Sequence, residues 1–425
     1  MAEKVNKVIT KDDKNKLKNI DIYSEGLKYL MNTYSRLPVV FEKAAMQYLW
    51  DVEGKKYTDF TSGYGCLNVG HSNKEVISAL KNQISKIIQP SNIYFSQPQV
   101  KLAKLLCSLT AGFGEKVFFA NSGTEAIEGA IKLARKYSTD KYGKKRYEII
   151  SFYNSFHGRT LGALSATAQT KKQSPFEPLL QGFRYASLND MDSVKNEVND
   201  KTCAILIEPV QGEGGINVTD KKFMKELRDL CTEKDILLVL DEIQTGFGRT
   251  GKLFAYENYN IIPDIMVVAK SLGGGMPIGA IISNDKISAA FSPGTHGSTF
   301  GGNAASCAAG VAVLEYFKKH DIIEASNKQG IYFLSELNNL KDRYENLIKE
   351  VRGMGLMLAV EFKYPVADEI VKFGLKNFFV LNKVSDFTIR FLPPLIIERK
   401  DIKNLMVFLN KTLKGFDKNA KSKKN

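Results

Sequence analysis

The sequence lacks the residue patterns of several protein classes. Its 425 residues include only five cysteines and four histidines, and none of these stand at the spacings of a metal or redox motif. An odd, scattered set of cysteines is typical of a reducing compartment, so we expect neither a disulfide framework nor a metal site. No apolar run approaches the length of a transmembrane helix, and the N-terminus lacks the apolar stretch of a signal peptide. These absences predict a soluble, cytoplasmic protein.

Positive charge is in excess, but it lacks the pattern of a nucleic-acid-binding protein. The formal net charge is +14. Part of it lies in two lysine-rich ends, residues 1–18 and 414–425, which we expect to be mobile and solvated. Arginine and aromatic residues are not interleaved on one element, as nucleic-acid binding would favour. We therefore expect no nucleic-acid or membrane partner, and an anionic substrate or phosphate cofactor fits the charge equally well.

Alternating strand and helix patterns predict an α/β fold with a mainly parallel sheet. Short apolar runs alternate with amphipathic helical patterns between about residues 115 and 318. Strands are predicted at 117–120, 148–152, 203–207, 236–240, 265–269 and 278–283. The chain length allows two or three domains.

A smaller α+β region is expected to follow the large one. The pattern predicts helices over 322–341 and 366–377 and strands over 351–362 and 387–392. We expect residues 1–85 to join this small domain, residues 86–316 to form the large domain, and residues 317–425 to complete the small one.

Two of the predicted strands run directly into a charged residue. The apolar run 236–240 ends at Asp241, and the run 265–269 ends at Lys270. Ligands of an open α/β sheet bind beyond the carboxyl ends of its strands. A buried lysine there can lose its proton and attack a carbonyl, while a carboxylate keeps a ring nitrogen protonated. Pyridoxal 5′-phosphate (PLP) requires this pair, although each residue alone is more often a helix cap or a solvated charge.

Two small-residue turns have the composition of anion-binding sites. The segment 120–125 (ANSGTE) lies between a predicted strand and a helix, where free amide groups and the helix dipole favour phosphate. The segment 294–303 also ends at a helix start. Either turn alone is more often an ordinary glycine loop.

Aromatic and charged residues follow other predicted strands. Phe156 and Arg159 lie in FHGRT, where the ring can stack on a flat cofactor and the guanidinium can hold a carboxylate. Glu208 and Glu213 stand five residues apart and can do acid–base work or pair with an arginine. Arg390 is a lone charge in a strand before Pro-Pro. A core phenylalanine, solvated acids and an edge-strand arginine are the ordinary alternatives.

One glycine-rich segment is similar to a nucleotide-binding loop. Residues 246–253 (GFGRTGKL) nearly match a P-loop, but Leu253 stands where a serine or threonine must hold magnesium. Phe247 and Arg249 would also crowd a loop wrapped around phosphate. A nucleotide-binding protein is the alternative from another class, and it predicts magnesium-dependent ATP binding that requires Lys252.

Taken together and in this order, the motifs resemble the class III aminotransferases, a family of fold-type I PLP enzymes. The resemblance extends from about residue 31 to about residue 413. It rests on the stretches VFFANSGTEA, NSFHGRTLGAL, EPVQGEGG, VLDEIQTGFGRTGKLFAYE, HGSTFGGN and IRFLPPL. It is nearest to the acetylornithine subtype, which implies transfer of the δ-amino group of N2-acetyl-L-ornithine to 2-oxoglutarate in arginine biosynthesis. It also implies a homodimer with shared active sites.

The resemblance implies roles for individual residues around the cofactor. Lys270 would attach to PLP and move protons, Asp241 would pair with the pyridinium nitrogen, and Glu208 would lie near the lysine. The implied cofactor-binding set is Ser122, Gly123, Thr124, Phe156, Asp241, Glu242, Ile243, Gln244, Lys270 and, from the neighbouring protomer, Thr299.

The resemblance also implies a substrate-binding set. Arg390 would take the α-carboxylate of glutamate, and Glu213 would pair with Arg390 when the other substrate is bound. The remaining members are Arg159, Ser298, Tyr34 and Tyr64. Tyr64 departs from the pattern of acetylornithine enzymes, which look to have a small aliphatic residue at this position. It resembles ornithine aminotransferases better there. Free ornithine, GABA and succinyl-diaminopimelate therefore stay open as donors.

Overall fold

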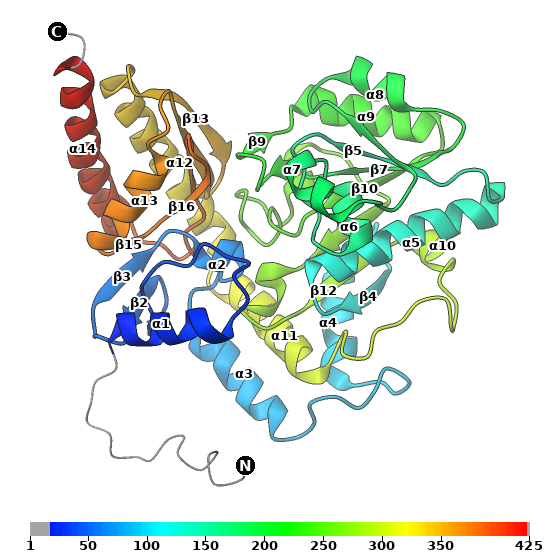
Figure 1. Cartoon of the computed structure of the whole chain (residues 1–425). Helices are drawn as coiled ribbons and strands as arrows, with labels where there is room; N and C mark the ends of the chain where they lie inside the picture. The colour runs from blue at the N-terminus through cyan, green and yellow to red at the C-terminus, as the bar shows by residue number, and fades with distance from the viewer. Residues whose placement is uncertain (1–17, 423–425) are drawn as a thin grey trace.

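The computed structural model describes residues 18–422, which form two lobes (Figure 1). The larger lobe is built on a seven-stranded sheet with the order β4-β12-β11-β10-β7-β5-β6. These strands are β4 (Lys116–Ala120), β12 (Gly279–Ser283), β11 (Ile265–Val268), β10 (Leu237–Asp241), β7 (Thr202–Ile207), β5 (Glu148–Phe152) and β6 (Phe183–Ala186).

The sheet is mainly parallel, and the predicted α/β fold is confirmed. Strand β10 pairs in parallel with β7 and β11, and β5 pairs in parallel with β6 and β7. Only β12 runs against its neighbours, β11 and β4. Every residue of β7, β10, β11 and β12 is buried. Burial on both faces explains why these strands are continuous apolar runs rather than alternating ones. Strand β6, which is short and half-exposed, was not predicted.

Helices cover this sheet and connect its strands. Helix α5 (Gly123–Tyr142) packs on β11 and β12, α9 (Lys221–Glu233) packs on β10, and α11 (Ala304–Lys319) packs on α3 and α4. Helix α3 (Lys74–Ile84) begins at the predicted cap, because the Asn73 side chain accepts hydrogen bonds from the amides of Glu75 and Val76. The remaining helices of this lobe are α4 (Gln97–Ser108), α6 (Leu161–Ala166), α7 (Thr170–Gln173), α8 (Met191–Glu197) and α10 (Asp285–Ser288).

The smaller lobe combines both ends of the described chain. One sheet has the order β13-β14-β17-β16, and another joins β1, β2 and β3 from the N-terminal side to β15 from the C-terminal side. The strands are β1 (Phe41–Ala45), β2 (Tyr48–Asp51), β3 (Lys56–Asp59), β13 (Ile348–Met354), β14 (Met357–Phe362), β15 (Phe379–Val380), β16 (Asn382–Ser385) and β17 (Thr388–Phe391). Its helices are α1 (Asn19–Tyr29), α2 (Ser62–Gly65), α12 (Ile322–Arg343), α13 (Ala367–Lys376) and α14 (Arg399–Ser422).

One prediction for this lobe is wrong, and one of its helices was not predicted. The single strand expected over 351–362 is the hairpin β13–β14, which turns at Gly355 with φ of +58°. The lysine-rich end from residue 414, for which no helix was predicted, continues α14 to Ser422. Buried Ile402, Leu405, Leu409 and Leu413 give this helix an apolar face at helical spacing, which the lysines mask in the sequence. The other lysine-rich end, up to residue 17, lies outside the described residues.

The glycine-rich segment 246–253 joins the two lobes through the buried side chain of Arg249. Its Nη1 donates to the carbonyl oxygens of Leu356 (3.1 Å) and Pro393 (2.6 Å), and its Nη2 donates to Asn68 Oδ1 (2.5 Å) and Ser62 Oγ (3.2 Å). Burial lowers the pKa of Arg249 to about 9. The segment is therefore filled by its own side chains and is scaffold, not a loop that wraps around a phosphate.

Replacing Arg249 by methionine is expected to lower the free energy of unfolding by about 2–4 kcal/mol, because its buried acceptors lose their donor. Urea unfolding of the purified holoprotein, followed by circular dichroism, measures the change. The matched control is Lys252→Met, since Lys252 is exposed on the same segment. This control should change stability by no more than about 0.5 kcal/mol. Equal stability of the two variants would contradict the role of Arg249 in joining the two lobes.

Candidate active site

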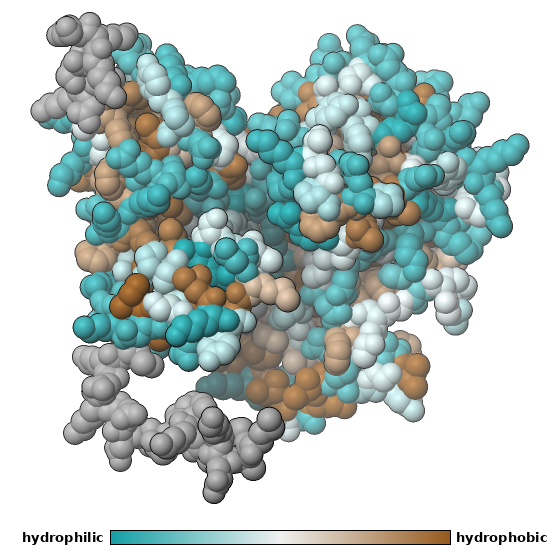
Figure 2. All heavy atoms as spheres, viewed as in Figure 1, coloured by the Kyte–Doolittle hydropathy of each residue, from teal (hydrophilic) through white to brown (hydrophobic). Residues whose placement is uncertain are grey.

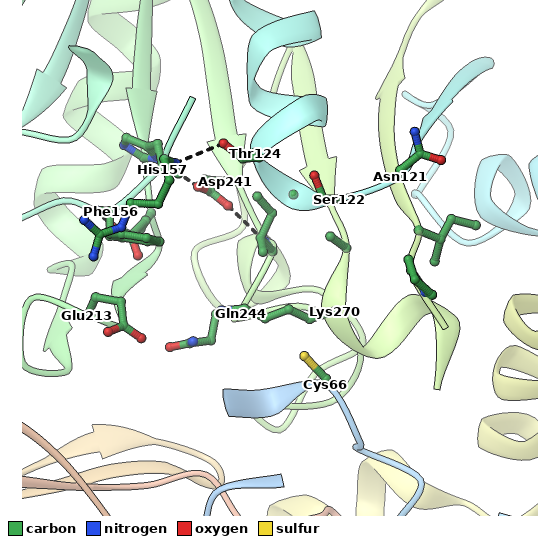
Figure 3. Close-up of a pocket in the computed structure, with 18 of the residues that line it drawn as sticks. Cys66, Asn121, Ser122, Thr124, Phe156, His157, Glu213, Asp241, Gln244 and Lys270 are labelled. Atoms are coloured by element: carbon green, nitrogen blue, oxygen red, sulfur yellow. Dashed lines mark hydrogen bonds and ion pairs between the residues drawn. The ribbon is translucent and has the colours of Figure 1, made fainter. Parts of the chain in front are cut away.

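The carboxyl edge of the large sheet surrounds a cavity of about 440 Å³. Segments that follow four neighbouring strands contribute side chains to it, as parallel strands of one sheet require. The polar and aromatic lining includes Asn121, Ser122, Thr124, Phe156, His157, Arg159, Glu208, Glu213, Asp241, Gln244 and Lys270. Figure 3 shows Asp241, Gln244, Lys270 and Cys66 around the same space.

Lys270 presents its amine to this cavity from the end of β11. Burial lowers the pKa of the amine, and the nearby Glu213 carboxylate opposes that shift. The backbone of Lys270 has φ of +46°, in the left-handed region that side-chain-bearing residues rarely adopt. The amine donates no hydrogen bond to any group among residues 18–422. These features give a lysine with an accessible neutral form and a free nucleophilic nitrogen.

Asp241 ends the neighbouring strand β10 and is held on both carboxylate oxygens. Its Oδ2 lies 2.7 Å from Nδ1 of His157, and its Oδ1 accepts from the Ile243 amide at 3.0 Å. Both Asp241 and His157 are buried. Sequence reasoning assigned no role to His157, although it lies in FHGRT, because its partner is 84 residues away. We infer that His157 orients the Asp241 carboxylate in the cavity wall.

The turn 121–124 lies at the start of α5, with its side chains in the cavity lining. Ser122 is the N-cap and accepts from the amide of Glu125 at 3.3 Å, and the first amides of a helix have no partner within it. A Cβ at Gly123 would lie 2.8 Å from Cδ1 of Ile243, so a larger residue here would require the Ile243 side chain to move. Unpartnered amides and a helix dipole favour an anion here, which agrees with the prediction that Gly123 and Thr124 bind phosphate.

Glu208 follows β7 and connects two other cavity loops. Its Oε1 accepts from the amide of Phe156 at 2.9 Å, and its Oε2 accepts from the amide of Gly212 at 3.1 Å. Burial raises the pKa of Glu208 to about 7, with His157 lowering it and Asp241 raising it. Glu208 thus fixes the backbone beside the Phe156 ring and can exchange a proton near neutral pH.

Glu213 and Arg390 form an ion pair across the two lobes. Arg390 Nη1 lies 2.6 Å from Glu213 Oε1, and the guanidinium is only 1% exposed. Asn382 Oδ1 accepts from Nη2 of Arg390 at 2.9 Å. Burial alone would raise the pKa of Glu213, but the Arg390 and Lys270 cations lower it below its usual range. The Tyr64 ring stands next to this pair, with its centroid 5.5 Å from Cζ of Arg390.

Glu242, which was expected among the cofactor-binding residues, is not part of the cavity lining. Its carboxylate is fully buried and accepts from Thr245 Oγ1 (2.7 Å), the Ala255 amide (2.9 Å) and the Tyr256 amide (2.8 Å). Glu242 follows the last residue of β10, and successive side chains of an extended segment point to opposite faces. It therefore stabilises the loop behind the sheet, while its neighbour Ile243 lines the cavity.

Five other predicted residues are not part of the cavity lining of this chain. Arg390 and Tyr64 stand beside it through the ion pair with Glu213 described above, and the other three are Tyr34, Ser298 and Thr299. Tyr34 is 71% exposed and Thr299 is also exposed. Ser298 Oγ accepts from Asn121 Nδ2 at 3.1 Å, which places it beside the phosphate-type turn. Cys66 does line the cavity, and burial raises the pKa of its thiol. Sequence reasoning gave Cys66 no role.

Comparisons with known proteins agree on one family. A family model described as aminotransferase class-III matches residues 29–413. The acetylornithine aminotransferase of Caldanaerobacter subterraneus is 47% identical over 91% of this chain and 97% of its own length. The acetylornithine aminotransferase of Methanocaldococcus jannaschii is 49% identical over 89% of this chain and 94% of its own length.

Solved structures agree with the same fold. The ornithine aminotransferase of Toxoplasma gondii superposes with a TM-score of 0.91 at 29% identity and covers 98% of each chain. The acetylornithine aminotransferase of Elizabethkingia anophelis gives a TM-score of 0.83 at 32% identity, over 93% of this chain and 98% of that one.

Purified protein is expected to be yellow, and borohydride should fix PLP to the peptide that contains Lys270. Lys270→Ala should lose this adduct and lower turnover at least about 1,000-fold, because no other group supplies the nucleophilic amine. Absorption spectra and peptide mass spectrometry measure both effects. The control Lys252→Ala should keep colour, adduct and turnover. A colourless wild-type protein that takes up no PLP would contradict the assignment.

Proposed function

The chain belongs to the class-III aminotransferases, as its motifs predicted, and is a PLP-dependent enzyme of fold type I; on this premise we propose its substrates. The donor is N2-acetyl-L-ornithine, whose δ-amino group moves to 2-oxoglutarate. The products are N-acetylglutamate 5-semialdehyde and L-glutamate, as in arginine biosynthesis. Relatives named for acetylornithine that match nearly the whole chain support this donor.

The residues of the cavity fit PLP. An unpartnered lysine amine, an oriented buried carboxylate, a helix N-terminus and a flat ring are the groups that this cofactor requires. Lys270 would hold it, Asp241 would keep the ring nitrogen protonated, and the amides of Gly123 and Thr124 would bind its phosphate. Phe156 would cover the ring face and Gln244 would bond to the phenolic oxygen. When bound, PLP supplies an electron sink that stabilises negative charge on the substrate carbon.

Lys270 is the group that moves the substrate proton. Because burial favours its neutral form, the amine would be able to accept a proton from the substrate carbon. Glu208 and His157 keep Phe156 and Asp241 in place while the proton moves. These two hydrogen bonds thus fix the positions of the ring and of the carboxylate beside the lysine side chain.

The Glu213–Arg390 ion pair is the observation that carries the proposal. The reacting carbon of 2-oxoglutarate bears a carboxylate, whereas the δ-carbon of acetylornithine bears none. One site must therefore offer a cation to the first substrate and hide it from the second. In the structure Glu213 neutralises Arg390 at 2.6 Å, which suits a terminal amine. Glycines at 212, 214 and 215 flank Glu213 and give its loop the freedom to release the arginine.

We also propose a homodimer with shared active sites, located in the cytoplasm. Figure 2 shows apolar residues gathered at the lower edge of the molecule, over the end of α3 and the loop after it. Ile93 and Phe95 there are 81% and 91% exposed, which is unusual for a surface that meets only water. Asn92 Nδ2 donates to the carbonyl oxygen of Ser298 at 2.8 Å, so this surface is continuous with Thr299. No helix within residues 18–422 is long and apolar enough to cross a membrane.

Mixing two inactive variants tests whether Thr299 serves the other protomer. Lys270→Ala removes the amine, and Thr299→Glu places a negative charge where the phosphate is expected. Subunit exchange between them should restore about one quarter of the wild-type activity, since half the dimers are mixed and each mixed dimer has one intact site. If Thr299 acts within its own chain, mixing restores no activity. Each variant exchanged with itself is the control.

Rates with 2-oxoglutarate and different donors test the proposed substrate. The value of kcat/KM for N2-acetylornithine should exceed those for ornithine and GABA at least about 10-fold. Tyr64→Ile should move the ratio a further 3- to 10-fold, roughly, against free ornithine, because tyrosine at this position resembles the ornithine aminotransferases and an aliphatic side chain removes a hydrogen-bonding group from the site. Tyr142→Ile, at the far end of α5, is the matched control. Preference for free ornithine would overturn the proposed donor, and an unchanged ratio in Tyr64→Ile would refute its selective role.

A further inference from the structure

Two cations without a carboxylate partner stand beside the Phe156 ring at the edge of the cavity. Cζ of Arg159 lies 5.6 Å from the ring centroid, and Nζ of Lys172 lies 5.7 Å from it. Phe156 and Arg159 line the cavity, whereas Lys172 is not one of its lining residues and is placed here by its contact with the Phe156 ring. Neither Arg159 nor Lys172 forms an ion pair with any carboxylate of the described residues. Sequence reasoning singled out Arg159 and assigned no role to Lys172.

Lys172 is held in this position by the protein around it. Its ammonium donates to Gln169 Oε1, and the Gln169 amide nitrogen is itself anchored on the carbonyl oxygens of Ser155 (2.8 Å) and Asn154 (3.3 Å). The lysine is half-buried, whereas the adjacent Lys171 on α7 is exposed. A neutral amide and an aromatic face orient the ammonium without cancelling its charge.

The two positive charges beside the Phe156 ring favour the binding of an anion. Burial lowers the pKa of Lys172, the Arg159 guanidinium lowers it further, and Glu213 opposes them. Glu213 is itself bound to Arg390, so it does not neutralise these two charges. Both cations contact the same ring, and like charges in one corner without a counter-ion repel one another. A carboxylate placed between them relieves this repulsion and gains two charge-assisted hydrogen bonds.

We propose that Lys172 is a specificity-determining residue that forms, with Arg159, a two-cation subsite for the substrate carboxylate farthest from the reacting carbon. The inference rests on the proposed function, because it assumes dicarboxylate and acetylated amino-acid substrates. That distal carboxylate is the α-carboxylate of N2-acetylornithine in one half-reaction. In the other it is the C5 carboxylate of 2-oxoglutarate. The subsite therefore serves both substrates unchanged, while only the Glu213–Arg390 pair has to switch.

Binding of glutarate to the holoenzyme tests the subsite without turnover, since glutarate has two carboxylates and no reacting group. In isothermal titration calorimetry, Lys172→Gln should weaken glutarate about 3- to 10-fold, as expected for loss of one partly buried charge contact. Lys172→Arg should restore most of the affinity. The matched control Lys171→Gln should change it less than about 2-fold.

A donor without the distal carboxylate separates this role from a general structural one. N-acetylputrescine is N2-acetylornithine without its carboxylate. Lys172→Gln should lower kcat/KM for N2-acetylornithine about 3- to 10-fold but leave that for N-acetylputrescine within about 2-fold. Equal losses for both donors, or unchanged glutarate binding, would overturn the role of Lys172. Weakened glutarate binding in an enzyme that does not turn over N2-acetylornithine would overturn the proposed donor and support the subsite.

Discussion

The parallel pairing of β10 with β11 is the constraint on which the active site depends. Asp241 is paired with Val267 in this register, so the acid ends one strand and Lys270 follows the end of the next. The strands are buried on both faces, which means that neither charge can turn toward solvent. The geometry of the pair is thus set by backbone hydrogen bonds, before any ligand is present. The other residues of the large lobe that line the cavity lie on segments next to these two strand ends.

Much of this edge was predictable because its signals are local. An apolar run followed by a charged residue identifies a strand end, and the turn ANSGTE identifies a helix start. Contacts between distant segments left no such signal: His157 meets Asp241 across 84 residues. Motif membership also does not show where a side chain lies: Glu242 belongs to the same motif as Asp241, but its carboxylate accepts hydrogen bonds from Thr245, Ala255 and Tyr256 behind the sheet, because side-chain direction alternates along an extended chain. The C-terminal helix was missed because its lysines outweigh apolar residues that only three-dimensional packing reveals.

Charge balance explains how one cavity can accept two different substrates. Arg390 is neutralised by a carboxylate on a glycine-flanked loop, so its charge is conditional. Arg159 and Lys172 have no such partner and contact a ring face and a neutral amide instead. In the proposed reaction the conditional cation would lie next to the reacting carbon, where the substrates differ. The permanent cations would lie where the substrates share a carboxylate. The arrangement separates recognition of common features from recognition of different ones.

Recognition by cations from both lobes requires that the two lobes keep a fixed distance. The glycine-rich segment 246–253 contributes to this. Arg390 belongs to the smaller lobe, on β17, while Gln244 and Lys270 belong to the larger one. Arg249 donates to the carbonyl oxygen of Pro393, which stands three residues after Arg390. Arg249 itself stands only five residues after Gln244 in the sequence. The buried guanidinium of Arg249 therefore links strand β17, which carries Arg390, to the sheet edge that carries Lys270. The loop that looks most like a phosphate site in the sequence acts instead by placing the arginine that receives a carboxylate.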